Sequence, residues 1–91
     1  MHKIKRQMVE ELLQAEELHQ EEFAKDRTSQ EYKNTLEILF HLHAKITVEN
    51  DDEKNKMAWL VIEITDAIAR AKLSLSRLLK CLEVCGIEVV E

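Results

Sequence analysis

Apolar positions along this chain recur at helical spacing in three segments, which short polar stretches separate. In the first segment, apolar side chains follow one another in steps that fit one helix face, at Ile4, Met8, Leu12, Ala15 and Phe23. Residues three or four positions apart lie on the same side of a helix, so this pattern is typical of an amphipathic helix. It predicts a helix over about residues 3–26.

The second segment carries the same periodicity, at Tyr32, Leu36, Leu39, His43 and Ile46. Just before it, Thr28 and Glu31 have the spacing of a capping box, in which each side chain satisfies a free amide at a helix start. We therefore expect a helix over about residues 29–48, joined to the first by a tight link and antiparallel to it.

The third segment has the longest uninterrupted apolar stripe of the chain. Its members step by four and three residues, as in a coiled coil: Met57, Val61, Ile64, Ile68, Ala71, Leu75, Leu78, Leu82 and Cys85. Gly86 follows directly, and glycine commonly ends a helix because it adopts positive φ without steric cost. The pattern predicts one helix over about residues 52–85, with Asp51 or Asp52 capping its first amides.

These segments predict an all-α fold, in which residues 1–91 form a single antiparallel helical bundle. The chain contains no proline and a single glycine, as long helices favour. A third helix of that length would extend about 50 Å, whereas a compact domain of this size is about 30 Å across. We therefore expect a second copy to cover the exposed part of the stripe in a homodimer or higher oligomer.

The third segment also supplies the residues expected at an interface. Trp59, Ile62 and Leu73 lie off the main stripe and form a second, narrower apolar stripe, which predicts a docking patch for another protein. The full set of predicted interface residues is Met57, Trp59, Leu60, Val61, Ile62, Ile64, Ile68, Ala71, Leu73, Leu75, Leu78 and Leu82.

Charge narrows the range of partners. The formal net charge is −5, so most of the surface repels a phosphate backbone, and we expect no nucleic acid partner. Apolar runs are too short to cross a bilayer and the first residues do not resemble a signal peptide, which predicts a cytoplasmic protein with no membrane partner. Cys81 and Cys85 are expected to be free thiols that pack as small apolar side chains.

No motif predicts a catalytic residue, a metal ligand or a cofactor. His19, His41 and His43 could meet across the helix hairpin, but no third metal ligand lies near them in the sequence. Glu63 and Asp66 have the spacing of a magnesium-binding pair in all-α nucleotide pyrophosphohydrolases of the MazG type, but the Glu-x-x-Glu sequence that would face them is missing. Whether these histidines and cysteines do more than pack stays open.

Two stretches resemble a known family. The C-terminal sequence LSLSRLLKCLEVCGIEVV, residues 73–90, is similar to the helix that closes the bundle of GrpE-type nucleotide exchange factors, including the glycine that ends it. LEILFHLHAKITV, residues 36–48, resembles the preceding bundle helix of that family, although the proline that opens the family's helix is absent. The resemblance implies a helical dimer and, by extension, an Hsp70-type partner.

We therefore expect a non-enzymatic, acidic helical protein that binds other proteins as a regulator, adaptor or inhibitor and assembles with itself. Three alternatives stay open: a GrpE-like cochaperone bundle, a MazG-like pyrophosphohydrolase, and a binder of small phosphorylated ligands. The last would need cations such as Arg70, Lys72 and Arg77 to converge at a subunit interface.

Overall fold

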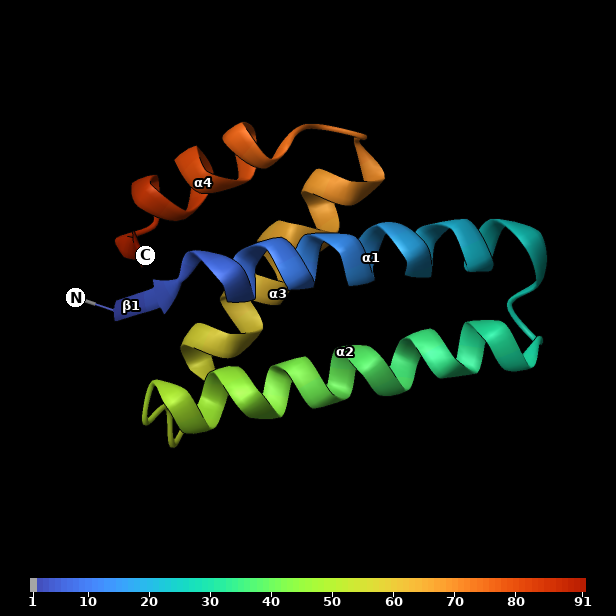
Figure 1. The fold of residues 1–91 in the computed structure, drawn as a ribbon, viewed down its shortest axis with the longest axis horizontal. Coiled ribbons are helices and arrows are strands. Elements are labelled where there is room, and N and C mark those ends of the chain that lie inside the picture. The colour runs from blue at the N-terminus through green and yellow to red at the C-terminus, as the bar shows by residue number, and fades with distance from the viewer. Residues whose placement is uncertain (1) are drawn as a thin grey trace.

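A computed structural model describes residues 2–91, which form four helices and two short strands (Figure 1). In chain order the elements are β1 (His2–Lys5), α1 (Arg6–Asp26), α2 (Gln30–Glu49), α3 (Lys56–Arg70), α4 (Leu75–Val84) and β2 (Ile87–Val90). The fold is thus mainly helical, with a small sheet in addition.

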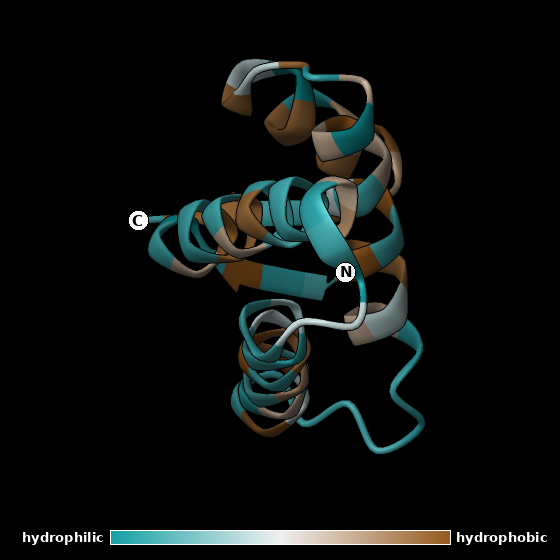
Figure 2. Ribbon diagram, turned by 90° about the vertical axis from the view of Figure 1, so that its right-hand side faces the viewer, coloured by the Kyte–Doolittle hydropathy of each residue, from teal (hydrophilic) through white to brown (hydrophobic). Residues whose placement is uncertain are grey.

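Helices α1 and α2 form an antiparallel hairpin, as the periodicity predicted. Ser29 begins α2, and its hydroxyl accepts a hydrogen bond from the amide of Tyr32 at 3.1 Å. The predicted capping box is wrong, because Thr28 instead donates its hydroxyl and its amide to Asp26. Helix α3 crosses behind the hairpin, and α4 returns along the side of α1 that faces away from α2 (Figures 1 and 2).

The prediction of a single helix over residues 52–85 is wrong, because the chain bends sharply between α3 and α4. Lys72 has a left-handed backbone, with φ of 56°. The amide of Lys72 bonds to the carbonyl of Ala69, and the amide of Leu73 bonds to the carbonyl of Ile68. This pair of hydrogen bonds is the Schellman motif, which ends a helix. The chain therefore has four helices where the sequence pattern predicted three.

The start of the chain also differs from the prediction, because residues His2–Lys5 form a strand and α1 begins at Arg6. Strand β1 pairs in parallel with β2, with Ile4 opposite Val89 and Lys3 opposite Glu88. Ile4 and Ile87 are buried on the core side of this sheet. The two ends of the described chain thus lie together.

The core lies where the hairpin, α3 and α4 meet. Its buried apolar residues come from every helix and both strands, and Val9, Leu12, Ile46, Val61, Leu78 and Leu82 are completely buried. Because α4 folds back, Leu78 and Leu82 pack within the same chain instead of extending the stripe into solvent. The molecule measures 39 × 27 × 20 Å, shorter than the predicted third helix alone.

The loop before α3 caps this helix as predicted. Asp52 accepts a hydrogen bond from the amide of Ala58 at 2.9 Å, which satisfies one of the free amides of the first turn. Among residues 2–91, no helix has the length and apolar character required to cross a bilayer.

Candidate functional site

A carboxyl pair lies between α1 and α3, in which Glu16 is buried and Asp66 is partly exposed. Glu16 occupies the core face of α1 and is only 2% exposed, among apolar neighbours. Asp66 of α3 faces it, accepts a hydrogen bond from Gln20 at 2.9 Å and pairs with Arg70 at 3.0 Å. Burial, followed by the hydrogen bond and the like charge of Asp66, raises the pKa of Glu16 to about 8, whereas Arg70 acts in the opposite direction.

One oxygen of Glu16, Oε2, is buried without a hydrogen-bond partner. A carboxylate in that position would lack both solvation and hydrogen bonds, so the protonated form is favoured at neutral pH. Glu16 is then uncharged, and the carboxylate of Asp66 pairs with Arg70.

His19 extends this polar cluster toward α2. Its Nδ1 lies 3.0 Å from the hydroxyl of Thr35, and its ring stacks on Tyr32 with centroids 5.0 Å apart. The Thr35 hydroxyl donates in turn to the backbone carbonyl of Tyr32, which leaves it to accept from His19. Burial lowers the pKa of His19, and the ring therefore favours its neutral form. These contacts fix the register between α1 and α2.

The residues considered for catalysis or metal binding do not come together. Asp66 turns toward α1, while Glu63 is exposed. His43 packs against Trp59, His41 is exposed, and neither contacts His19. Within residues 2–91, no group of three or more His, Cys, Asp or Glu side chains has a metal-binding arrangement.

The cationic residues and the thiols are likewise dispersed. Arg70 is held by Asp66, Lys72 lies in the turn after α3, and Arg77 is exposed on α4. Cys81 is partly buried against the core as expected, but Cys85 is exposed, so the prediction that it packs as an apolar side chain is wrong.

The predicted interface residues divide into two groups. The first lies in the core of this chain: Met57, Val61, Ile68, Leu78 and Leu82 are buried, and Ile62, Ile64 and Leu75 pack against them partly buried. The second group is open to solvent: Trp59, Leu60, Ala71 and Leu73. The main stripe therefore serves the fold of the single chain.

A largely exposed apolar surface, which the sequence pattern did not predict, lies on α2. Leu36, Phe40, Ala44 and Val48 follow one another at intervals of four residues and form what we call the α2 ridge. Phe40 is 66% exposed and Val48 is 79% exposed, and Ala44 between them is also exposed. On the flank of the ridge, Trp59 leans against His43 with ring centroids 4.7 Å apart and is 52% exposed.

The sequence alone does not distinguish the α2 ridge, since uncharged residues at intervals of four also occur elsewhere in the chain, for example at Met57, Val61, Thr65 and Ala69. On the same helix, Leu39 and Ile46 form the face that contacts the core, and the helical periodicity of the sequence reports that face. No protein-family model, curated protein or solved structure matches this chain.

Proposed function

We propose that this chain is a non-enzymatic protein-binding module that associates with itself through the α2 ridge. The observation that carries the proposal is the exposure of Phe40 and Val48 on a ridge without charged residues. Large apolar side chains that gather on one surface mark interaction sites, and aromatic residues are enriched in the centre of interfaces.

The spacing of the ridge favours a second copy as its occupant. Side chains at intervals of four form the rows that interdigitate when two helices pack, and two identical rows meet naturally about a two-fold axis. The four side chains of the ridge are uncharged, so the centre of such a contact brings no like charges together. Trp59 would lie at the edge of the contact.

This interface differs from the one that the sequence pattern predicted. The long stripe of the third segment is covered by its own chain, so it no longer requires a partner. Trp59 is the residue common to both interpretations, and it remains available for contact.

Light scattering over a range of protein concentrations tests the proposal. We expect a mass of twice 10.7 kDa for the wild type, and a mass of one chain for Phe40→Glu. Val84→Glu is the matched control, because Val84 is 80% exposed on α4, away from the ridge, and this variant should remain a dimer. A wild type that stays monomeric at every concentration, or dimers that persist in Phe40→Glu, would overturn self-association through this ridge.

A further inference from the structure

The two-stranded sheet has an open edge on β2. In residues 2–91 the sheet consists of β1 and β2 alone, so each strand has one neighbour. Parallel pairing directs alternate backbone N–H and C=O groups away from that neighbour. No backbone hydrogen bond from another described element reaches Ile87–Val90. The outer edge of β2 therefore retains free donors and acceptors.

The two edges of this sheet differ in how well their side chains prevent the addition of another strand. Strand β1 carries Lys3 and Lys5, and lysines on an edge strand discourage the addition of another strand. Strand β2 has the sequence Ile-Glu-Val-Val, rich in β-branched residues that favour strands, and Glu88 is its one charged side chain. The open edge of β2 is thus suited to receive a further strand.

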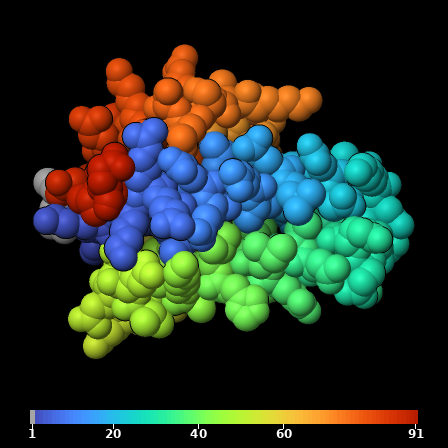
Figure 3. Space-filling view, in the orientation of Figure 1, coloured from blue at the N-terminus to red at the C-terminus, as the bar shows by residue number. Residues whose placement is uncertain are grey.

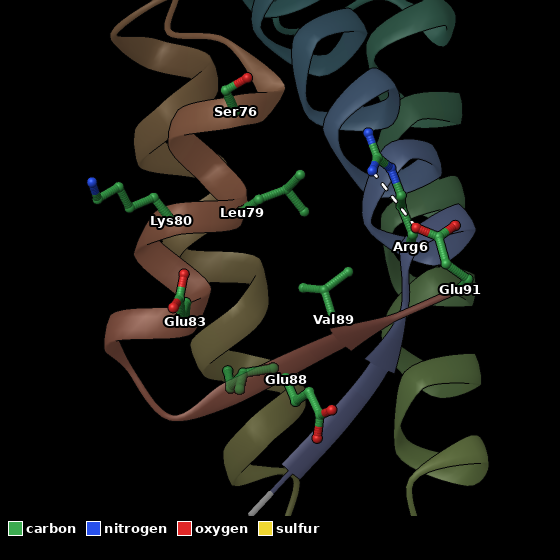
Figure 4. A pocket seen from close by; sticks show the side chains of 9 residues that line it. Arg6, Ser76, Leu79, Lys80, Glu83, Glu88, Val89 and Glu91 are labelled. Carbon is green, nitrogen blue, oxygen red and sulfur yellow. Dashed lines mark ion pairs between the residues drawn. The ribbon is translucent and has the colours of Figure 1, made fainter.

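A cleft of about 620 Å³ runs beside this edge, between β2 and α4 (Figure 4). Ile87, Glu88 and Val89 all border it, and consecutive strand residues point to opposite faces, so the cleft follows the edge of β2. Leu79 projects into the cleft from α4, and Val89 projects from β2 toward the same space. Figure 3 shows the C-terminal residues at the surface between α4 and the start of α1.

The charges around the cleft favour a basic occupant. Glu83, Glu88 and Glu91 contribute three carboxylates to its lining. Arg6 is already engaged, by Glu10 at 3.1 Å and by Glu91 at 3.7 Å. The side chain of Lys80 points away from β2. Glu83 and Glu88 therefore remain free to pair with cations of a bound segment.

We propose that the cleft binds an extended peptide segment of a partner protein, with alternating apolar and basic residues, which adds as a third strand to the open edge of β2. Its backbone bonds to β2, its apolar side chains contact Leu79 and Val89, and its lysines or arginines face Glu83 and Glu88. About four extended residues, or roughly 13 Å, match the length of β2. This site does not depend on self-association through the α2 ridge.

Fluorescence anisotropy with a labelled hexapeptide, acetyl-Lys-Val-Lys-Val-Lys-Val-amide, tests the proposal on the full chain. Two isomers of this peptide are compared, one N-methylated at the three valines and the other at the three lysines. Both keep every charge, but they block opposite edges of the peptide. Strand addition requires one edge only, so we expect one isomer to bind roughly tenfold more weakly than the other. Equal binding by the two isomers, or no binding by the parent peptide, would overturn strand addition.

Charge reversal on the protein tests the location. The double variant Glu83→Lys/Glu88→Lys should weaken binding of the parent peptide by about tenfold or more, because both residues are exposed and border the cleft at the edge of β2. Glu37→Lys/Glu53→Lys is the matched control, with the same change in net charge at exposed positions outside the cleft. Equal weakening in both double variants would show that overall charge, rather than this cleft, binds the peptide.

The two proposals fail separately. Phe40→Glu should retain peptide binding, and Glu83→Lys/Glu88→Lys should retain the dimer, because the ridge and the cleft use different residues. If Glu83→Lys/Glu88→Lys instead abolishes the dimer, the open edge of β2 receives a second copy of this chain and the peptide proposal is wrong.

Discussion

The carboxyl group of Glu16 on α1 faces that of Asp66 on α3, and its burial there raises the pKa of Glu16 to about 8. The two residues lie 50 positions apart in the sequence, and their contact links α1 to α3. Arg70 pairs with the carboxylate of Asp66. Because Glu16 is buried with one oxygen unpartnered, its ionisation would place a second negative charge in the core. We therefore expect the stability of the contact between α1 and α3 to depend on pH.

The first prediction concerns this pH dependence. The pKa of Glu16 is about 8 in the native state against 4.5 for an ordinary glutamate, so between these values the native state binds more protons than the unfolded state. The contribution of Glu16 to the free energy of unfolding is fully present below pH 4.5 and is lost as the pH rises through 8. Urea unfolding should give a lower free energy of unfolding at pH 8 than at pH 6.5.

Glu16→Gln isolates the contribution of this residue, because glutamine has the same shape and cannot ionise. At pH 8 we expect the variant to be more stable than the wild type by about 1 to 3 kcal/mol, and less dependent on pH. Glu17→Gln, at the exposed neighbouring position, should leave the pH dependence unchanged. His19 also contributes to the pH dependence, because its pKa is lowered from the ordinary value of 6.5. Its effect is a loss of stability as the pH falls below 6.5, so the two proteins are compared above that pH. An unchanged slope in Glu16→Gln would contradict the assignment.

The second prediction separates folding from assembly. Leu78 belongs to the stripe that the sequence pattern assigned to a subunit interface, yet it is fully buried within its own chain. Leu78→Ala should therefore lower the free energy of unfolding by about 2 to 5 kcal/mol in any oligomeric state. The matched control is Leu60→Ala, since Leu60 is 37% exposed and its truncation should cost far less. Chemical unfolding at several protein concentrations checks this, and a loss of dimer without loss of stability would restore the interface interpretation.

The hairpin could be predicted from the sequence because α1 and α2 each bury a single stripe at helical spacing, and a polar link with strong cap formers joins them. The strands could not be predicted in the same way. His2–Lys5 has a single apolar residue, Ile4, among its four positions, and its partner Ile87–Val90 lies at the far end of the chain. So short a pattern indicates a strand only when the partner is known to be adjacent.

The candidate site was only partly visible in the sequence. Asp66 was recognised, but with Glu63 as its companion, because the two share one helix turn. Its actual companion is Glu16, one of many glutamates on α1, and its burial follows from the angle at which α3 crosses the hairpin. The stripe position of Glu16, between Leu12 and His19 on the inner face of α1, was the signal that could have distinguished it.

The third prediction concerns Gly86, which joins α4 to β2 with φ of 82°. A Cβ at this position would meet no atom within 4 Å, so the cost of a side chain is that of the backbone conformation alone. Gly86→Ala should lower the free energy of unfolding by about 1 kcal/mol, and Gly86→Asn by less, because asparagine tolerates left-handed backbone better. Thermal unfolding of the two variants checks this order, and equal losses would contradict the explanation by strain.

The fourth prediction concerns the turn that divides the third apolar stripe. A lysine at position 72 gives no sequence signal for a helix end, and the stripe continues in register through Ala71 and Leu75. The folded chain nevertheless favours a turn here over a continuous helix, because α4 can bury Leu78 and Leu82 against the core only if the chain turns back. The Schellman hydrogen bonds of Lys72 and Leu73 stabilise the turn, at the cost of a left-handed lysine.

Lys72→Gly removes that cost and should raise the free energy of unfolding by about 0.5 to 1 kcal/mol, although glycine normally destabilises a helix by a similar amount. Lys72→Ala, which also removes the charge and the long side chain, should give no such gain because alanine has the same difficulty with positive φ. Urea unfolding of both variants distinguishes a turn at residue 72 from a continuous helix. If the stripe formed one continuous helix instead, Lys72→Gly would destabilise the protein and Lys72→Ala would not, so the sign of the glycine effect decides whether the chain turns at this residue.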